Sequence, residues 1–343
     1  METLINHKRF KKIFTDKDLK NYIAYTKIFD FPQTEYAYFN FFNNYAKKNY
    51  TLLPTKCLCK KENDILLSKV DRHGVEFHTV ICKECGLIRA KEYFSNDNIN
   101  DFYKNHYRKI WDDIENSTPE YLYNQQIINF EERFEIIKNF GKINFTNQTK
   151  ILDLGGGTGG SLEIFKPSKE LYLADYHDPY LNFARNKDIN VIKGGLKEIK
   201  FSPDLIILSH VVEHWSDFEY EINELIRIQK KNITINYIEF PGIDSLKLGR
   251  RSGDLLGDIQ IPHIYYFTSY VFENLMSRYG FKKIYIDSKC RSLFLYDGII
   301  NKTDNYFKKV EKDLLLAEKQ RNFMAFKKIV RLYAPKIIFN FLK

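Results

Sequence analysis

The sequence is short of the features that mark secreted and membrane-spanning proteins. Among its 343 residues there are five cysteines, at positions 57, 59, 82, 85 and 290, too few and too clustered for a disulfide scaffold. No apolar run approaches the roughly 18 residues that span a bilayer, and the segment 1–8 lacks the apolar core of a signal peptide. We therefore expect a cytoplasmic protein.

What the chain does contain is typical of a globular protein. Hydrophobic residues make up 44% and aromatic residues 16% of the sequence, which excludes an intrinsically disordered chain and allows one large domain or two modest ones. The net charge of +9 favours an anionic partner. A nucleotide-sugar phosphate, a lipid headgroup and RNA all fit that description, and charge alone does not choose among them.

The segment 150–160, with the sequence KILDLGGGTGG, is the feature around which the chain is organised. Its aliphatic residues predict a buried strand, and the glycines predict a loop whose bare backbone approaches a ligand, because glycine has no Cβ. The spacing fits the G-x-G-x-x-G pattern of dinucleotide-binding proteins. It also fits a D-x-G-x-G-x-G loop that starts at Asp153, so the loop by itself leaves both readings open.

Three later segments distinguish these readings. Asp175 ends the next predicted strand and can accept both hydroxyls of a ribose, which suits either ligand. The segment 203–215 is a buried strand that runs into a polar turn with two histidines. Together with YIEFPG at 237–242 and HIYYFT at 263–268, it resembles the class I S-adenosylmethionine-dependent methyltransferases. The resemblance is closest to bacterial enzymes of sugar and surface-polysaccharide pathways and covers roughly residues 55–300.

The order of predicted elements agrees with that resemblance. Strands and helices alternate, which implies a mostly parallel sheet. The last two strands are separated by three residues, 288–290, too few for a parallel crossover, so they should form an antiparallel hairpin. We expect a Rossmann-like α/β fold whose seven-stranded sheet is parallel except for the last strand. Its strands are expected near 150–154, 170–175, 189–193, 203–209, 232–239, 282–287 and 291–298.

Two cysteine pairs precede this domain. Cys57 and Cys59 are separated from Cys82 and Cys85 by a segment of hairpin length, and four thiolates on two turns suit a tetrahedral Zn²⁺ ion. Related methyltransferases often carry such a cysteine module. The first pair has one intervening residue where that pattern has two, which leaves its ligands open, with His73 and His78 as substitutes. Four protein ligands would make the zinc structural.

The composition of the chain's two ends and the resemblance of the part between them predict the following organisation. A helical region at 1–53 is followed by the cysteine module at 54–92, and a helical connector that covers the cofactor occupies 93–149. The methyltransferase domain occupies 150–300, and a basic helical tail occupies 301–343. The helix from 120 to 140 is expected to end with Gly141 as its C-cap. The apolar end of the tail suits an acidic membrane surface, a partner subunit or its own domain.

The resemblance also implies residue roles. Asp153 is expected to fix the glycine loop, and Asp175 to bind the ribose. The expected adenosylmethionine-binding residues are Asp153, Gly155, Gly156, Gly157, Gly159, Asp175, Tyr176, Leu196 and Ser209. Removal of a hydroxyl proton from the acceptor needs a base, and a neutral histidine serves near pH 7. The candidates are His210, His214 and His263, of which the resemblance favours the last two.

The acceptor side is predicted from charge. The segment 241–262 is rich in glycine and charge, as a lid over an anionic substrate would be. Arg250 and Arg251 in that segment are candidates to grip a diphosphate. Glu239 is expected to contact the substrate or anchor the lid, and Glu213 to cap the helix that follows it.

These observations predict a methyltransferase that acts, at oxygen, on a sugar or glycan precursor. One alternative is an RNA methyltransferase that holds RNA with its cysteine module. The dispersed basic residues argue against it, and we do not expect a nucleic-acid partner. The other alternative is a catalytically silent scaffold, which would not need to retain the glycine loop and Asp175. The atom methylated stays open among oxygen, nitrogen and carbon.

Overall fold

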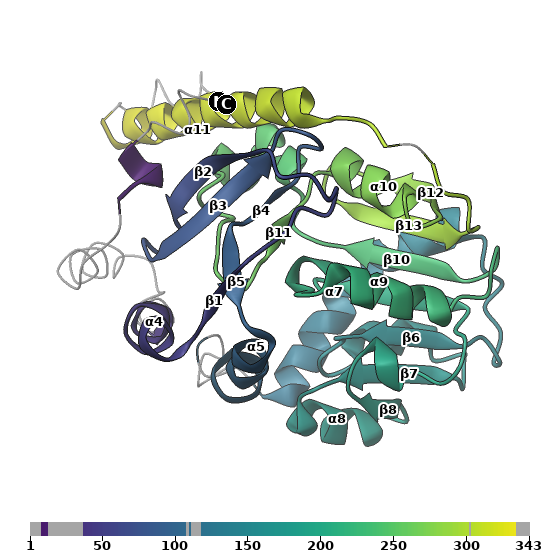
Figure 1. The fold of residues 1–343 in the computed structure, drawn as a ribbon. Coiled ribbons are helices and arrows are strands. Elements are labelled where there is room, and N and C mark those ends of the chain that lie inside the picture. The colour runs from purple at the N-terminus through teal and green to yellow at the C-terminus, as the bar shows by residue number, and fades with distance from the viewer. Residues whose placement is uncertain (1–7, 13–36, 108–109, 111–117, 302, 334–343) are drawn as a thin grey trace.

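A seven-stranded and a four-stranded β-sheet form the frame of the protein (Figure 1). The structure is a computed structural model, and it describes residues 8–12, 37–107, 110, 118–301 and 303–333. In the described part of the chain, no helix is both long and apolar enough to cross a membrane.

The larger sheet has seven strands in the order β12-β13-β10-β9-β6-β7-β8. The five strands from β10 to β8 are parallel, and β13 runs antiparallel to both β10 and β12. This confirms the predicted Rossmann-like sheet and its terminal hairpin. The strands are β6 (Ile151–Leu154), β7 (Leu171–Asp175), β8 (Asn190–Lys193), β9 (Leu205–Ser209), β10 (Ile235–Glu239), β12 (Phe281–Ile286) and β13 (Arg291–Tyr296).

Alternate side chains of these buried strands enter two different apolar cores, as the pleat requires. Ile151, Leu205 and Ile207 pack under η4 (Gly160–Phe165), α7 (Pro119–Gly141) and α8 (Asp178–Arg185). Leu152, Ile206 and Leu208 belong to the core on the opposite face, which includes apolar side chains of η5 (Leu196–Glu198), α9 (Phe218–Arg227) and α10 (Ser269–Ser277). The left-handed residue that ends α7 is Lys142, not the predicted Gly141.

The smaller sheet contains the cysteine module and has the order β11-β4-β3-β2. Its strands are β2 (Asp64–Val70), β3 (Glu76–Cys82), β4 (Ile88–Ala90) and β11 (Tyr265–Tyr266). A separate pair is formed by β1 (Leu52–Pro54) and β5 (Glu92–Phe94). Because β11 lies between β10 and α10 in sequence, the part of the chain that forms the larger sheet also supplies the edge strand of the smaller one.

The segment expected to form a lid is a packed element instead. It contains η7 (Ile243–Leu248) and η8 (Arg250–Gly253), both in contact with α11 (Phe307–Tyr333). Ile243, Leu246, Leu255 and Ile259 are buried. The sequence showed the glycines and charges of this segment, but its apolar residues decide its structure, because burying them under α11 holds it in place.

Helices cover the remaining edges. The N-terminal side has η1 (Lys8–Phe10), η2 (Phe41–Ala46) and α4 (Lys47–Asn49), and the connector has α5 (Asn96–Asp101) and η3 (Phe102–His106). Phe307, Val310, Leu314 and Ala317 bury one side of α11 against its own chain. Part of the expected helical region at 1–53 and the end of the expected basic tail lie outside the described residues.

Candidate active site

The glycine loop leaves β6 at the carboxyl edge of the larger sheet. The N–H of Gly155 donates to the carbonyl of Ala174 at 2.7 Å, which ties the start of the loop to β7. Gly155, Gly157 and Gly159 have φ values of +68°, +59° and +80°, a region that glycine enters without steric cost. Three of the five loop residues thus have a left-handed backbone, and within 155–159 only Gly155 is exposed.

Asp153 supports this loop from below. Its side chain is 2% exposed and accepts a hydrogen bond from the hydroxyl of Ser161. A Cβ on Gly156 would lie 2.3 Å from Asp153 Oδ2, so glycine is required at that position. Burial, opposed by the hydrogen bond from Ser161 and helped by the charge of Asp175, raises the pKa of Asp153 to about 7. The geometry gives Asp153 the expected contact with the loop.

Gln126 on α7 holds the other side of the loop, and the sequence analysis did not identify it. Its Nε2 donates to the carbonyl of Gly156 at 2.9 Å. Its Oε1 accepts from Thr158 Oγ1 at 2.6 Å and from the N–H of Gly160 at 3.0 Å. No local sequence pattern marks a glutamine inside a helix as a loop ligand, since the contact is made across more than 30 residues.

Asp175 lies at the end of β7, next to the glycine loop. Its carboxylate accepts from the N–H of Gly157 at 3.0 Å and from the N–H of His177 at 2.8 Å. A carboxylate has about four acceptor positions, so capacity for ribose hydroxyls remains. These backbone bonds fix the orientation of the carboxylate beside the loop.

The other predicted cofactor residues are spread around this edge. The Tyr176 side chain is 71% exposed, and its hydroxyl would lie 2.8 Å from a Cβ on Gly195. Leu196, the first residue of η5, is buried in the apolar core. Ser209 is half-buried at the end of β9, opposite Glu239 of β10.

A polar turn follows β9 and borders the glycine loop. Val211 in this turn would lie 3.0 Å from a Cβ on Gly155. His210 has a φ of +58°, which is uncommon for a residue other than glycine, and its side chain is 50% exposed. Glu213 and His214 lie in the short helix η6 (Val212–His214). Asp217, not Glu213, caps α9, because its side chain accepts from the N–H of Tyr220.

His263 meets this turn from a distant part of the chain. The rings of His214 and His263 pack edge to face, with centroids 4.7 Å apart. The N–H of Ile264 donates to the carbonyl of Glu213 at 2.9 Å, which joins the two segments. The structure therefore brings together the three histidines that the sequence analysis singled out, with Glu213 among them.

Hydrogen bonds orient both of the packed histidines. His214 Nδ1 lies 2.8 Å from the carbonyl of Pro262 and 3.0 Å from Tyr103 Oη. Because a carbonyl only accepts, the proton of neutral His214 belongs on Nδ1. The side-chain amide of Gln260 lies 2.6 Å from His263 Nε2.

The histidines differ in proton affinity. Burial lowers the pKa of His263 well below its ordinary value, and the neighbouring His214 and His210 lower it further. Desolvation also disfavours charge on His210, but Glu213 and Glu239 outweigh it and raise the pKa of that ring. Neutral His263 and a more basic His210 thus lie in one site.

The predicted acceptor-binding residues are largely occupied by internal contacts. Burial alone would raise the pKa of Glu239, but its ion pair with Arg133 of α7 holds that pKa below the ordinary value. Tyr237 Oη also donates to Glu239, at 2.9 Å. Arg250 donates to both oxygens of Asp258, to Ser245 and to the carbonyl of Gly242. Arg251 is 53% exposed and lies 3.5 Å from Asp258.

The four clustered cysteines converge in the second sheet. Their Sγ atoms all lie within 4.8 Å of one another, with Cys57 3.4 Å from Cys59 and 3.5 Å from Cys85. Sulfurs bound to zinc at about 2.3 Å lie roughly 3.8 Å apart in a tetrahedron, so this geometry fits the ion. The N–H of Glu84 points to Cys82 Sγ at 3.4 Å.

The C-x-C spacing therefore permits all four thiols to meet, and the suggested histidine substitutes lie elsewhere. The backbone N–H of His73 donates to Asp71 Oδ1, and the His73 side-chain Nε2 accepts from Arg72 Nε. His78 lies beside Glu76 on β3. Neither joins the cysteine cluster among the described residues.

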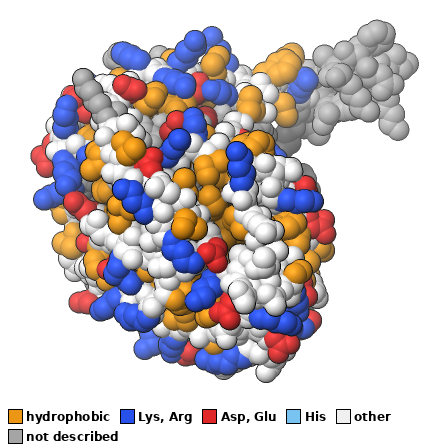
Figure 2. All heavy atoms as spheres, turned by 90° about the vertical axis from the view of Figure 1, so that its right-hand side faces the viewer, with side chains coloured by type: hydrophobic (Ala, Val, Ile, Leu, Met, Phe, Trp, Pro, Cys, Tyr) orange, Lys and Arg blue, Asp and Glu red, His pale blue; other side chains and the backbone are white. Residues whose placement is uncertain are grey.

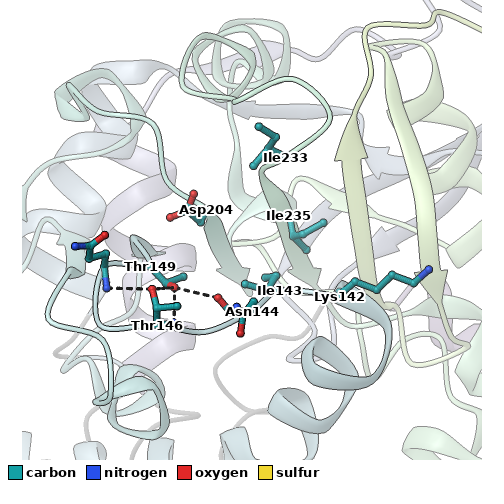
Figure 3. A pocket seen from close by; sticks show the side chains of 10 residues that line it. Lys142, Ile143, Asn144, Thr146, Thr149, Asp204, Ile233 and Ile235 are labelled. Atoms are coloured by element: carbon teal, nitrogen blue, oxygen red, sulfur yellow. Dashed lines mark hydrogen bonds between the residues drawn. The ribbon is translucent and has the colours of Figure 1, made fainter.

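A pocket at the opposite edge of the larger sheet contains none of the predicted site residues. Lys142, Asn144, Thr149 and Asp204 line it, at the amino ends of β9 and β10 (Figure 3). Its threonine and asparagine groups bond one another, and Asp204 pairs with Lys230. This pocket lies away from the glycine loop, and the catalytic candidates do not line it.

The part of the chain that contains the glycine loop is similar to known proteins. Residues 123–286 match the protein family described as a methyltransferase domain. The chain is 25% identical over 150 residues to the 3-O-methylredipecamine 2-O-methyltransferase IpeOMT3 of Carapichea ipecacuanha, over 42% of this chain and 41% of that protein. It thus spans less than half the length of that relative.

Two solved structures match this chain over nearly the whole of their own length. The PH0226 protein from Pyrococcus horikoshii OT3 is 18% identical with a TM-score of 0.40, covering 56% of this chain and 98% of that one. The magnesium protoporphyrin IX methyltransferase from Synechocystis PCC 6803 with bound SAH is 14% identical with a TM-score of 0.39. It covers 58% of this chain and 98% of that one.

The lowered pKa of His263 predicts an acid-dependent loss of stability. Above the ordinary histidine pKa of about 6.5, His263 is neutral in both the folded and unfolded states, and its contribution is fully present. Below that pH the unfolded state gains a proton that the folded state does not take up. The free energy of unfolding then falls, by at most about 1.4 kcal/mol per pH unit from this group.

The variant His263→Gln removes this contribution. Urea titrations in chelator-containing buffer should show a smaller drop in unfolding free energy between about pH 7.5 and 5.5 than in the wild type. Curves of equal slope for the two proteins would contradict the neutral, buried state of His263.

Proposed function

We propose that the chain transfers a methyl group from S-adenosylmethionine to a hydroxyl of a sugar or glycan precursor. One observation carries the proposal. The glycine loop, Asp175 and the turn at 210–214, called the histidine turn below, lie together at the carboxyl edge of the larger sheet. In open α/β sheets, ligands bind at the carboxyl ends of the strands. The methyltransferase domain match over 123–286 includes all three features.

The residues at this edge fit adenosylmethionine. The glycine loop exposes Gly155, against which the methionine part would lie, and Asp175 has acceptor capacity for the ribose hydroxyls. Tyr176 and the backbone around Gly195 border the place where the adenine would lie. Bound there, adenosylmethionine supplies a methyl group on a sulfonium, and the chain's part is to align the acceptor and exclude water.

His210 is the proposed acceptor of the hydroxyl proton. Its ring is half exposed beside the glycine loop, whereas His214 is bonded to Pro262 and His263 is buried against Gln260. As the acceptor oxygen bonds to the methyl carbon, the sulfonium becomes a thioether and the hydroxyl proton passes to the His210 imidazole. Glu213, 3.4 Å from His210 Nδ1, stabilises the imidazolium that forms.

A glycan acceptor rests on the sequence resemblance alone, whereas transfer to oxygen and the argument against RNA each have a separate observation behind them. The curated relative is an O-methyltransferase. On the face shown in Figure 2, Lys and Arg side chains are scattered among acidic and hydrophobic ones, without the basic stripe that an RNA-binding surface would need. We place this activity in the cytoplasm.

The cysteine cluster is proposed to bind structural Zn²⁺. Four thiolates at these separations satisfy its tetrahedral geometry and leave no open position, so the ion would hold the turns after β1 and β3 together.

Cofactor binding is tested by the pair Asp175→Asn and Asp178→Asn. Hydrogen bonds to a charged acceptor contribute about 1.5 to 3 kcal/mol, so Asp175→Asn should weaken adenosylmethionine binding by roughly tenfold to hundredfold in calorimetric titrations. Asp178 lies three residues further along and pairs with Lys193 at the surface, so its variant should bind like the wild type. Equal affinities for all three proteins would contradict the assigned ribose site.

The acceptor class is tested with labelled methyl transfer into a lysate of source cells that lack the protein. We expect label in nucleotide-sugar or glycolipid fractions. Label confined to RNA would replace the glycan proposal with the RNA methyltransferase, and the absence of both label and cofactor binding would favour the scaffold.

The role of His210 is tested with His210→Asn, because asparagine tolerates the left-handed backbone but cannot act as the base. The rate constant kcat should fall by roughly 10² to 10⁴ while adenosylmethionine affinity is retained. In the wild type, kcat/KM should rise with pH through the raised pKa of His210, because only the neutral ring accepts a proton. A variant that keeps full activity, or the same rising limb, would exclude His210.

Zinc binding is tested by element analysis of purified protein. Cys59→Ser and Cys85→Ser should each lower the zinc content by about one equivalent per chain. Cys290→Ser changes a buried cysteine outside the cluster and is the matched control. An unchanged zinc content in Cys59→Ser would remove Cys59 from the ligand set.

A further inference from the structure

Glu213 is a buried carboxylate without a hydrogen-bond donor. It is 1% exposed, and neither side-chain oxygen has a hydrogen-bond partner in the described part of the structure. Its backbone is fixed, since its carbonyl accepts from Ile264. A buried, ionised carboxylate costs several kcal/mol unless a cation compensates it.

The imidazoles of His214 and His263 lie close enough to Glu213 for all three side chains to bind one cation. One carboxylate oxygen of Glu213 and one ring nitrogen each of His214 and His263 all lie within 4.8 Å of one another. His214 Nε2 lies 3.9 Å from Glu213 Oε1, while its Nδ1 is held by the carbonyl of Pro262. A carbonyl bonded to the second ring nitrogen is the usual way in which a protein orients a metal-binding histidine.

We propose that Glu213, His214 and His263 bind a divalent transition-metal ion. Two imidazoles and one carboxylate suit Zn²⁺ or Mn²⁺ better than Ca²⁺. Ligand atoms bound at about 2.1 Å lie roughly 3 to 3.5 Å apart, so binding draws the three side chains together. The Gln260 amide can present either its oxygen or its nitrogen to His263 and so accommodates the tautomer that binding requires.

The site would differ in kind from the cysteine cluster. Three protein ligands leave a coordination position open, as in catalytic zinc centres, whereas four thiolates close the coordination sphere. If the proposed function also holds, a metal bound by these residues would supply Lewis-acid chemistry to an acceptor hydroxyl. Metal binding itself does not depend on that function.

His210 is the competing partner of Glu213, because its Nδ1 lies 3.4 Å from the same carboxylate. If protonated His210 is the only cation beside Glu213, then no metal binds there. The two arrangements give opposite results in a metal-binding experiment.

The experiment uses the full-length chain with its cysteine cluster loaded with zinc, after a mild chelator has removed free zinc and lowered the content to one zinc per chain, so that the Glu213 site is empty. Mn²⁺ is then titrated, and free Mn²⁺ is followed by electron paramagnetic resonance. We expect one Mn²⁺ per chain in the wild type, and at least a tenfold weaker affinity in Glu213→Gln and His263→Gln. Glu219→Gln is the matched control, since Glu219 is an exposed glutamate six residues further along, paired with Lys60.

A second measurement guards against loss of fold. Mn²⁺ should raise the Tm of the wild type and of Glu219→Gln but not that of Glu213→Gln, whose own Tm without Mn²⁺ shows whether it is folded. Equal Mn²⁺ binding in Glu213→Gln and the wild type, or no binding by the wild type, would overturn the proposal. Adenosylmethionine binding, measured on the same samples, separates this outcome from failure of the proposed function.

Discussion

The pairing of β11 with β4 is the constraint on which the arrangement of the site depends. Tyr265 and Tyr266 pair with Arg89 and Ile88, and the N–H of Ala90 donates to the carbonyl of Ile264. These bonds fasten the residues directly after His263 to the sheet of the cysteine module. On the other side, Ile264 donates to the carbonyl of Glu213 in the turn after β9. His263 is thus held between two sheets, which makes the cysteine module part of the site's framework.

The histidine turn combines groups whose environments push their proton affinities apart. Burial keeps His263 neutral, while two carboxylates favour the charged form of His210. Glu239 takes no proton from this system, because Arg133 compensates it. Neighbouring groups whose pKa values are shifted in opposite directions are typical of sites of acid–base chemistry. Here His263 and His210 form such a pair next to the glycine loop.

Much of this could be predicted from local pattern, and the rest depends on contacts between distant residues. Buried strands, the glycine loop and the terminal hairpin follow from short segments, so their positions were predicted within a few residues. The support given by Gln126 and Arg133, the strand β11, and the burial of the segment 241–262 under α11 all depend on tertiary packing. Arg250 shows the difference, because its charge indicated a phosphate ligand, whereas the fold pairs it with Asp258.

The most direct test of this account is a crystal structure of the chain with S-adenosylhomocysteine. We predict that the ribose hydroxyls contact Asp175, that the amino-acid part lies over the backbone of 155–159, and that the sulfur faces the turn of His210. A ligand bound elsewhere, such as in the pocket beside Asp204, or a ligand whose sulfur faces away from the histidines, would contradict the proposed active site.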